Sequence, residues 1–404
     1  MAMDCDHHSW RGLGLTDLSL HSSVAHARGH DASTDESLIA EVANQKLRLP
    51  LDQKDIEMKR VKRQPSRFGT VDLADQVGRE FNLPLDRLSE KFSFEAATKI
   101  ARENRSLMYG RRAERMFEYV VASLGKADLI TAEDASAPLY AGIEVQAPDY
   151  FVSLKTGQKF FVEVKNTEPK TIHTRITFGN AYLSRLKHYA KLKGHPLLIA
   201  VYWNDLRTWT INKIEDFETK NGTIILRFVD AYQRSIAGDF GDRMVATIPP
   251  LVCRIHAASD RPSSLQKNDQ ASFTISALSF YIENKEILNE REQQIAFYLM
   301  FHSAWEDEMP IATMDGERVA YVEIAARQAG EKSLDQPFES LGTLAGMISS
   351  YYKWLTTTDD EVVRLTPQLE PAELAPGFDD AYRGEVLRLW QFQIESNYEP
   401  LIRG

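Results

Sequence analysis

The sequence predicts an α/β fold over residues 98–215, with a helical segment before it and an α+β region after it. Three observations lead to this prediction. One helix with a one-sided apolar stripe ends near residue 125, two alternating strands follow around residues 148–166, and a second amphipathic helix leads into a short apolar strand. The resulting order, helix–strand–strand–strand–helix–strand–strand, is typical of α/β domains.

The first helix is predicted by apolar residues spaced three and four positions apart, which gives a helix one buried side. Gly125 supplies its stop signal. Glu114 lies at the edge of the stripe, so we expect its carboxylate to reach the space between helix and sheet. The stripe comprises Ala113, Met116, Phe117, Val120, Val121 and Leu124.

The segment PDYFVSLKTGQKFFVEVKN, residues 148–166, predicts two antiparallel strands joined by a turn at residues 155–158. Side chains alternate between the two faces of a strand. Glu163 and Lys165 therefore share one face, and Val164 packs on the other. A preceding strand that begins at Asp149 can bring its carboxylate beside Glu163.

The second helix is predicted over residues 181–193, with Gly194 as its C-terminal stop. Its apolar side carries Tyr182, Leu183, Leu186, Tyr189 and Ala190. The run at 196–203 that follows is apolar throughout, as expected of a central strand covered on both faces. Residues 207–211 predict one further strand.

Two carboxylates and one ammonium around a strand pair are the groups that metal-dependent phosphodiester cleavage requires. Carboxylates hold Mg²⁺, and a bound metal lowers the pKa of its water and neutralises charge on the phosphate. A lysine can orient the attacking water or hold the phosphate as a compact charge. Asp149, Glu163 and Lys165 are the candidates for these roles.

A Glu-x-Lys triplet alone is a weak signal, because the chain holds five of them, beginning at Glu57, Glu163, Glu168, Glu218 and Glu283. Four lie in polar surroundings and are interpreted as solvated pairs. Only the triplet at Glu163 lies in an apolar strand, where burial of charged groups costs free energy. Only this triplet follows a Pro-Asp dipeptide.

Asp149, Glu163 and Lys165 resemble the signature of the PD-(D/E)xK nuclease superfamily, which includes restriction endonucleases and archaeal Holliday-junction resolvases. Many members carry a glutamate in a Gly-x-x-x-Glu pattern on the preceding helix, and Gly110–Glu114 matches it. The resemblance covers about residues 100 to 213. It implies a restriction-endonuclease-like α/β/α sandwich on a mixed sheet.

The resemblance also implies the chemistry. Asp149, Glu163 and Glu114 would bind Mg²⁺, with Mn²⁺ as a substitute, and Lys165 would position or activate the water. The substrate would be DNA rather than RNA, in restriction, antiphage defence or DNA repair. Some relatives complete the site with a polar residue on the next helix; here that helix offers Asn180, Tyr182, Ser184 and Arg185, and none is singled out. One metal or two remains open.

The charge distribution favours a nucleic-acid substrate locally. The chain has a net charge of −10 and a pI near 5.6, which excludes a general polyanion binder. Residues 165–195, however, hold seven lysines and arginines and one acidic residue, Glu168. Phosphate contacts are expected from Arg111, Arg112, Arg185, Lys187 and Lys191.

The remaining sequence suggests four regions. We expect a flexible tail at 1–34, a helical lead-in with a basic linker at 35–97, the nuclease core at 98–215, and an α+β domain of unknown role at 216–404. The last would include helices at 338–355 and 382–394. It could bind a protein partner or a second copy of the chain.

Two cysteines and the lack of a signal sequence or a ~20-residue apolar span lead us to expect a cytoplasmic protein without membrane contact. Two other functions stay open. One is an effector nuclease that is silent until a partner or a signal activates it. The other is a catalytically idle nuclease fold that binds nucleic acid or serves as a scaffold.

Overall fold

The chain forms two compact units, between which its described residues are divided. The computed structural model describes residues 82–90, 93–133, 142–169, 171–220, 223–265, 271–307, 309–328, 337–375 and 382–398, and the single positions 74, 77, 78, 140 and 378. One unit contains Asp55–Arg243, Leu344–Ala375 and Gln393–Gly404, and the other contains Met244–Thr343 and Pro376–Phe392. The expected tail at 1–34 and the basic linker lie outside the described residues.

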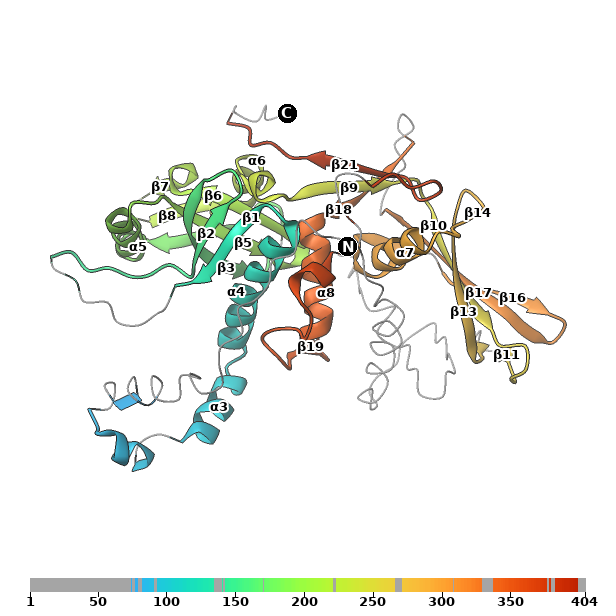
Figure 1. The fold of residues 1–404 in the computed structure, drawn as a ribbon, viewed down its shortest axis with the longest axis horizontal. Helices are drawn as coiled ribbons and strands as arrows, with labels where there is room; N and C mark the ends of the chain where they lie inside the picture. Colours follow the sequence, from blue (N-terminus) through green and yellow to red (C-terminus); the bar gives the residue numbers. More distant parts are fainter. Residues whose placement is uncertain are drawn as a thin grey trace. The chain divides into compact units, whose positions relative to one another are not determined.

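The unit that contains residues 98–215 is a mixed α/β structure (Figure 1). Its helices are η2 (Leu85–Glu90), α3 (Phe94–Glu103), α4 (Arg105–Leu124), α5 (Asn180–Lys193), η3 (Asn204–Leu206), η4 (Ile214–Asp216), α6 (Phe228–Gln233), η5 (Ala237–Phe240), α8 (Leu344–Thr356) and η6 (Pro371–Leu374). Its strands are β1 (Ala127–Ala132), β2 (Tyr150–Leu154), β3 (Lys159–Thr167), β4 (Arg175–Gly179), β5 (Leu197–Trp203), β6 (Thr208–Lys213), β7 (Glu218–Lys220), β8 (Thr223–Arg227), β19 (Thr357–Thr358) and β20 (Glu361–Val362).

A five-stranded mixed sheet, in the order β1-β2-β3-β5-β6, forms the centre of this unit. The β1–β2, β2–β3 and β5–β6 pairs are antiparallel, whereas β3 and β5 are parallel. Because β3 and β5 are parallel, the chain between them must cross over the sheet, and this crossover consists of β4 and helix α5. β4 itself belongs to a separate three-stranded sheet, β4-β8-β7.

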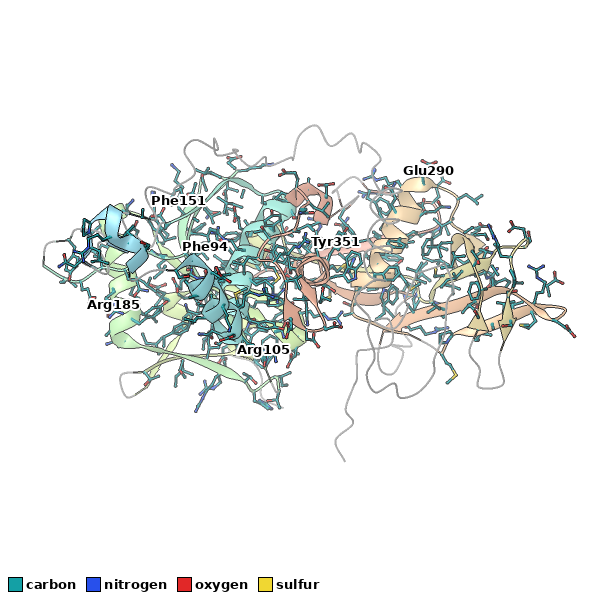
Figure 2. All side chains as sticks on the ribbon, turned by 90° about the horizontal axis from the view of Figure 1, so that it is seen from below. Phe94, Arg105, Phe151, Arg185, Glu290 and Tyr351 are labelled. Carbon is teal, nitrogen blue, oxygen red and sulfur yellow. The ribbon has the colours of Figure 1, made fainter. Side chains whose placement is uncertain are left out.

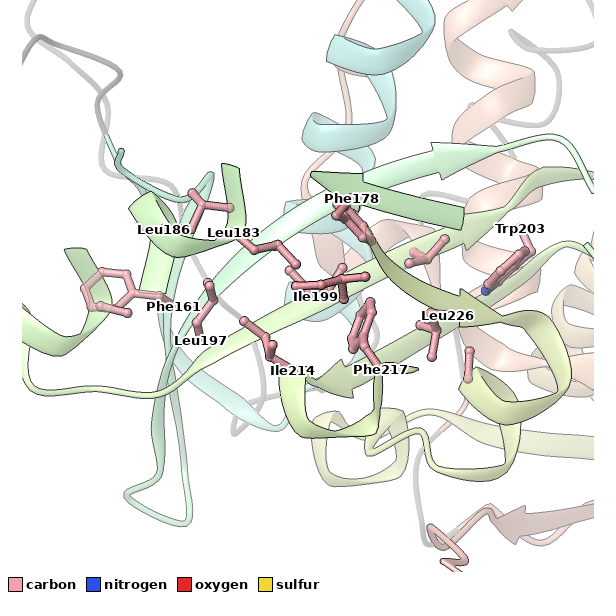
Figure 3. Packing of buried hydrophobic residues seen from close by; sticks show 14 residues of the cluster. Phe161, Phe178, Leu183, Leu186, Leu197, Ile199, Trp203, Ile214, Phe217 and Leu226 are labelled. Atoms are coloured by element: carbon pink, nitrogen blue, oxygen red, sulfur yellow. The ribbon is translucent and has the colours of Figure 1, made fainter. Parts of the chain in front are cut away.

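Helix α5 covers one face of the central sheet. Leu183, Leu186 and Ala190 of α5 pack with Phe161 of β3 and Ile199 of β5 in a buried apolar cluster (Figure 3). Every residue of β5 is buried, in agreement with the apolar run that predicts a central strand. Gly194, with φ of 78°, ends α5 in the left-handed region that glycine adopts without strain.

Helices α4 and α8 lie side by side in this unit (Figure 1), and α4 covers the other face of the sheet. The Phe117 ring of α4 lies 5.7 Å from Tyr150 and 5.6 Å from Trp209. All six residues of the predicted stripe of α4 are buried, and Gly125 ends the helix with φ of 74°. Tyr119 of α4 makes an edge-on contact with Tyr352 of α8.

The other unit is mainly antiparallel β-structure. Its elements are β9 (Arg243–Thr247), β10 (Leu251–Ala257), β11 (Ser264–Leu265), β12 (Ala271–Ser272), β13 (Ile275–Ile282), β14 (Lys285–Glu286), α7 (Glu290–His302), β15 (Trp305–Asp307), β16 (Ile311–Asp315), β17 (Arg318–Gln328), β18 (Glu339–Thr343) and β21 (Leu389–Gln393). Its largest sheet has the order β14-β13-β10-β17-β15, with β16 paired to β17.

The C-terminal region differs from its prediction in three ways. The range 216–404, expected as one domain, is divided between the two units. The helix predicted at 338–355 begins only at Leu344, because residues 339–343 pair with β9. The helix predicted at 382–394 is wrong, since residues 389–393 form β21. The backbone amides of residues 385–387 donate to the buried Glu292 carboxylate instead of to helix carbonyls.

Candidate active site

Asp149 lies immediately before β2, at the edge of the central sheet. Its Oδ2 atom accepts a hydrogen bond of 2.7 Å from the Val164 backbone amide, and its own carbonyl accepts one from the Glu133 amide. Tyr150 is paired with Val162 in the β2–β3 ladder. Continuing this antiparallel register by one residue places Asp149 opposite Glu163, as the strand pattern predicts.

Glu163 and Lys165 lie on the α5 face of β3, and their side chains are in contact. The Lys165 Nζ atom lies 2.5 Å from Glu163 Oε1 and 3.0 Å from the Tyr182 hydroxyl. The Tyr182 hydroxyl also donates to Glu163 Oε1. Glu163 is only 3% exposed, whereas 35% of the Lys165 side-chain surface is accessible to solvent. The three groups thus form a closed hydrogen-bonded cycle in which Glu163 is buried and Lys165 and Tyr182 are partly exposed.

The two carboxylates influence each other electrostatically. Burial, the neighbouring Glu163 charge and, to a smaller extent, the charge of Glu114 together raise the pKa of Asp149 to about 7, although the Val164 amide and Lys165 act in the opposite direction. Burial alone would lower the pKa of Lys165, but the Glu163 carboxylate and the Tyr182 hydroxyl raise it above its ordinary value. Lys165 is therefore a cation near neutral pH, and Asp149 is poised between its two protonation states.

Glu114 lies on α4 within electrostatic reach of Asp149. Its Oε2 atom accepts a 2.8 Å hydrogen bond from Arg111, one helical turn earlier. This bond and the charge of Glu114 raise the pKa of Arg111. Asp149 also contributes to that shift, so Arg111, Glu114 and Asp149 belong to one charged neighbourhood.

The carboxylates form a small donor set. Among the described residues, no group of three His, Cys, Asp or Glu side chains is arranged to hold a metal ion. Mg²⁺ is commonly bound by one or two carboxylates, with waters and phosphate oxygens as its other ligands. Asp149 and Glu163 fit that requirement, because a cation would relieve the repulsion that raises the pKa of Asp149.

The residues predicted to contact phosphate differ in their exposure to solvent. Arg111, Lys187 and Lys191 are exposed. Arg185 of α5 (Figure 2) is half-buried and donates to the Gln146 side chain, with its Nη1 atom 3.8 Å from Glu144.

Arg112 is only 1% exposed. Its guanidinium lies 5.6 Å from the centre of the Tyr109 ring, and its Nε and Nη1 atoms have no hydrogen-bond partner among the described residues. Burial lowers its pKa. Because this side chain does not face solvent, it is unsuited to a phosphate contact.

Two other Glu-x-Lys triplets, those at Glu283 and Glu168, have side chains whose burial can be compared with that of Glu163. Glu283 and Lys285 are exposed, and Glu283 lies in the turn between β13 and β14. Of the triplet at Glu168, the described glutamate is exposed. Neither glutamate shares the burial of Glu163, so the apolar strand context distinguished the triplet at Glu163 from these two.

Tyr182 is the residue in this cluster that the sequence did not single out. It begins the apolar stripe of α5, and its ring packs at the edge of the buried cluster. The ring also lies 5.2 Å from Lys165 Nζ. The available signal was its place in the first turn of the helix that follows Lys165, but an apolar stripe equally accounts for a tyrosine there.

Comparison with known proteins gives only weak structural likeness. No family model and no curated protein sequence matches the chain. Among solved structures, it is similar to a Holliday junction resolvase from the archaeal hyperthermophile Archaeoglobus fulgidus. The identity is 16% and the TM-score 0.26, over 33% of this chain and 96% of the resolvase. A likeness of this size carries no argument about function. In the described part of the chain, no helix is long and apolar enough to span a membrane.

Proposed function

We propose that this protein is a metal-dependent nuclease of the PD-(D/E)xK type that hydrolyses phosphodiester bonds, with DNA as its substrate. One observation supports the proposal most strongly. Asp149, immediately before β2, accepts a hydrogen bond from the Val164 amide of β3, next to Glu163, and the Lys165 ammonium lies 2.5 Å from the Glu163 carboxylate. A buried carboxylate that pairs with a partly accessible lysine beside a second carboxylate is costly unless the site has a use.

Asp149 and Glu163 would hold one divalent cation, Mg²⁺ or Mn²⁺. Glu114 is a further candidate ligand, because its charge acts on Asp149. When bound, such a cation would make its water more acidic and neutralise charge on the phosphate. The PD-(D/E)xK fold, an α/β/α sandwich, is consistent with α4 and α5 on opposite faces of the mixed sheet.

Lys165 supplies a positive charge beside the two carboxylates. Its ammonium would orient the attacking water by donating a hydrogen bond to the water oxygen, or it would hold a non-bridging phosphate oxygen. In the hydrolysis the water gives up one proton to solvent as its oxygen forms a bond to phosphorus, the bond from phosphorus to the leaving oxygen breaks, and the leaving oxygen takes up one proton from solvent. The products are one phosphate monoester end and one hydroxyl end.

Exposed basic residues support a nucleic-acid substrate. Arg111 lies on the helix that carries Glu114, and Lys187 and Lys191 are four residues apart on α5, so they face the same way. Such residues would bind the phosphate backbone without reading sequence. Arg112 is left out of this set because it is buried. The preference for DNA rests on the resemblance of the motif alone.

The test is cleavage of plasmid and linear DNA by the purified chain with Mg²⁺, with Mn²⁺ and with EDTA. We expect cleavage with either cation, none with EDTA, and a loss of at least a hundredfold in Glu163→Gln. Glu283→Gln and Lys285→Ala are matched controls, because they alter an exposed Glu-x-Lys triplet. They should cut like the wild type.

Two results would contradict the proposal. One is cleavage that persists in EDTA or in Glu163→Gln at the wild-type rate, which would show that neither a divalent cation nor this site is needed for the reaction. The other is a wild-type chain that cuts neither DNA nor RNA and does not bind Mn²⁺. That result would favour a catalytically idle module that binds nucleic acid. A chain that binds Mn²⁺ at this site and cuts only with a partner present would be an activated effector.

A further inference from the structure

We infer that Tyr182 is a positioning residue of the proposed nuclease site, which fixes the Glu163 carboxylate for the metal and the Lys165 ammonium for the reaction. The inference rests on the proposed function. It concerns a residue on a different element, helix α5, whose hydroxyl contacts both Glu163 and Lys165 of β3.

The geometry gives the hydroxyl two roles at once. It donates to Glu163 Oε1 and lies 3.0 Å from Lys165 Nζ, so its lone pair can accept an ammonium hydrogen. Lys165 itself donates to the same Oε1 atom. Both donors therefore use one carboxylate oxygen, and the Oε2 atom stays outside this cycle. An outer hydrogen bond of this kind fixes the orientation of a metal-ligating carboxylate.

The position of Tyr182 is itself well fixed. Its ring packs against the buried cluster that includes residues of α5, β3 and β5, and the ring centre lies 5.2 Å from the Lys165 Nζ atom. A side chain anchored by its ring at one end and bonded at its hydroxyl has little freedom to move. This matches the requirement that site residues be held by packed supporting groups.

Tyr189 provides a matched control on the same helix. It lies two turns after Tyr182, its ring packs against the same cluster, and its hydroxyl also donates to a carboxylate, that of Glu133. At either position, the change from tyrosine to phenylalanine thus removes one hydrogen bond from a hydroxyl to a carboxylate. Only at position 182 does that carboxylate belong to the pair proposed to hold the metal.

The test is Mn²⁺ binding, measured by electron paramagnetic resonance without nucleic acid, for wild type, Tyr182→Phe, Tyr189→Phe and Glu163→Gln. We expect Tyr182→Phe to weaken Mn²⁺ binding about tenfold, the lower end of the usual outer-shell effect, and Tyr189→Phe to match the wild type. In cleavage assays Tyr182→Phe should lower kcat about tenfold or more without changing KM for DNA, because no phosphate contact is lost. Melting curves in EDTA establish that each variant is folded.

The outcomes separate this inference from the function on which it rests. If Mn²⁺ binds the wild type and Glu163→Gln abolishes that binding, but Tyr182→Phe binds as the wild type does, the role of Tyr182 is overturned and the nuclease proposal stands. Equal losses in Tyr182→Phe and Tyr189→Phe would also overturn it, since they would reflect a general effect on α5. A wild type that binds no Mn²⁺ would overturn both.

Discussion

Replacement of Asp149 by asparagine should stabilise the metal-free protein. Burial and the Glu163 charge raise the pKa of Asp149 from 3.8 to about 7. Because the Asp149 carboxyl group loses its proton less readily in the folded state than in the unfolded state, its ionisation favours unfolding. Stability is therefore highest where Asp149 is protonated, falls as the pH rises from about 4 to about 7, and stays reduced at higher pH. Asparagine lacks this charge and keeps an oxygen that can accept the Val164 amide hydrogen.

The size of the effect follows from the shift. A change of about three pKa units corresponds to about 4 kcal/mol at 1.36 kcal/mol per unit, an upper limit reached above pH 7. We expect the free energy of unfolding of Asp149→Asn to exceed that of the wild type by up to that amount at pH 8 in EDTA. At pH 4 the two free energies should be almost equal. Mg²⁺ should stabilise the wild type and leave the variant unchanged, because binding to the folded state adds stability.

Urea unfolding at pH 4, 6 and 8, with EDTA and with Mg²⁺, measures both effects. Asp128→Asn is a suitable control, because Asp128 is an exposed aspartate on β1 of the same sheet. It should show neither the gain at pH 8 nor a changed response to Mg²⁺. An Asp149→Asn variant that is less stable than the wild type at pH 8 in EDTA would refute the reasoning.

Three other changes test separate parts of the account. Lys165→Ala should reduce cleavage at least a hundredfold while DNA affinity, measured by fluorescence anisotropy, stays within about threefold; equal losses of both would contradict its assigned role. Lys187→Ala with Lys191→Ala should weaken binding similarly for all DNA sequences and reduce the slope of log affinity against log salt by about 2; an unchanged slope would exclude these lysines as phosphate contacts. Glu292→Ala should destabilise the β-rich unit by about 3 kcal/mol in urea unfolding, because the amides of residues 385–387 lose their buried acceptor; unaltered unfolding would show that water replaces the carboxylate at no cost.

The helices and strands around the site were predictable because their sequence patterns are local. The stripe of α4 is followed by a glycine in the left-handed region, and β5 is apolar along its whole length. Strand periodicity also placed Glu163 and Lys165 on one face and Asp149 opposite Glu163. These features depend on residues close in the chain, which a pattern of period 2 or 3.6 captures.

The remaining features depend on partners that are distant in sequence. Residues 389–393 form a strand because β9 is available for pairing, and residues 385–387 avoid a helix because Glu292 binds their amides. Arg112 was expected to face a phosphate, yet it is buried beside Tyr109. Tyr182 was placed in an apolar stripe and was one of four polar residues on that helix, none of which was singled out. In each case the tertiary contact, and not the local pattern, determines the role of the residue.

The central claim, that Asp149 and Glu163 together hold a catalytic divalent cation, is tested most directly by a crystal structure of the protein with Mn²⁺ and its anomalous scattering. We predict an anomalous peak at about 2.0–2.3 Å from one carboxylate oxygen of each residue, a spacing typical of such cations, and its loss in Glu163→Gln crystals. A peak elsewhere, or none between these two carboxylates at saturating Mn²⁺, would contradict the claim.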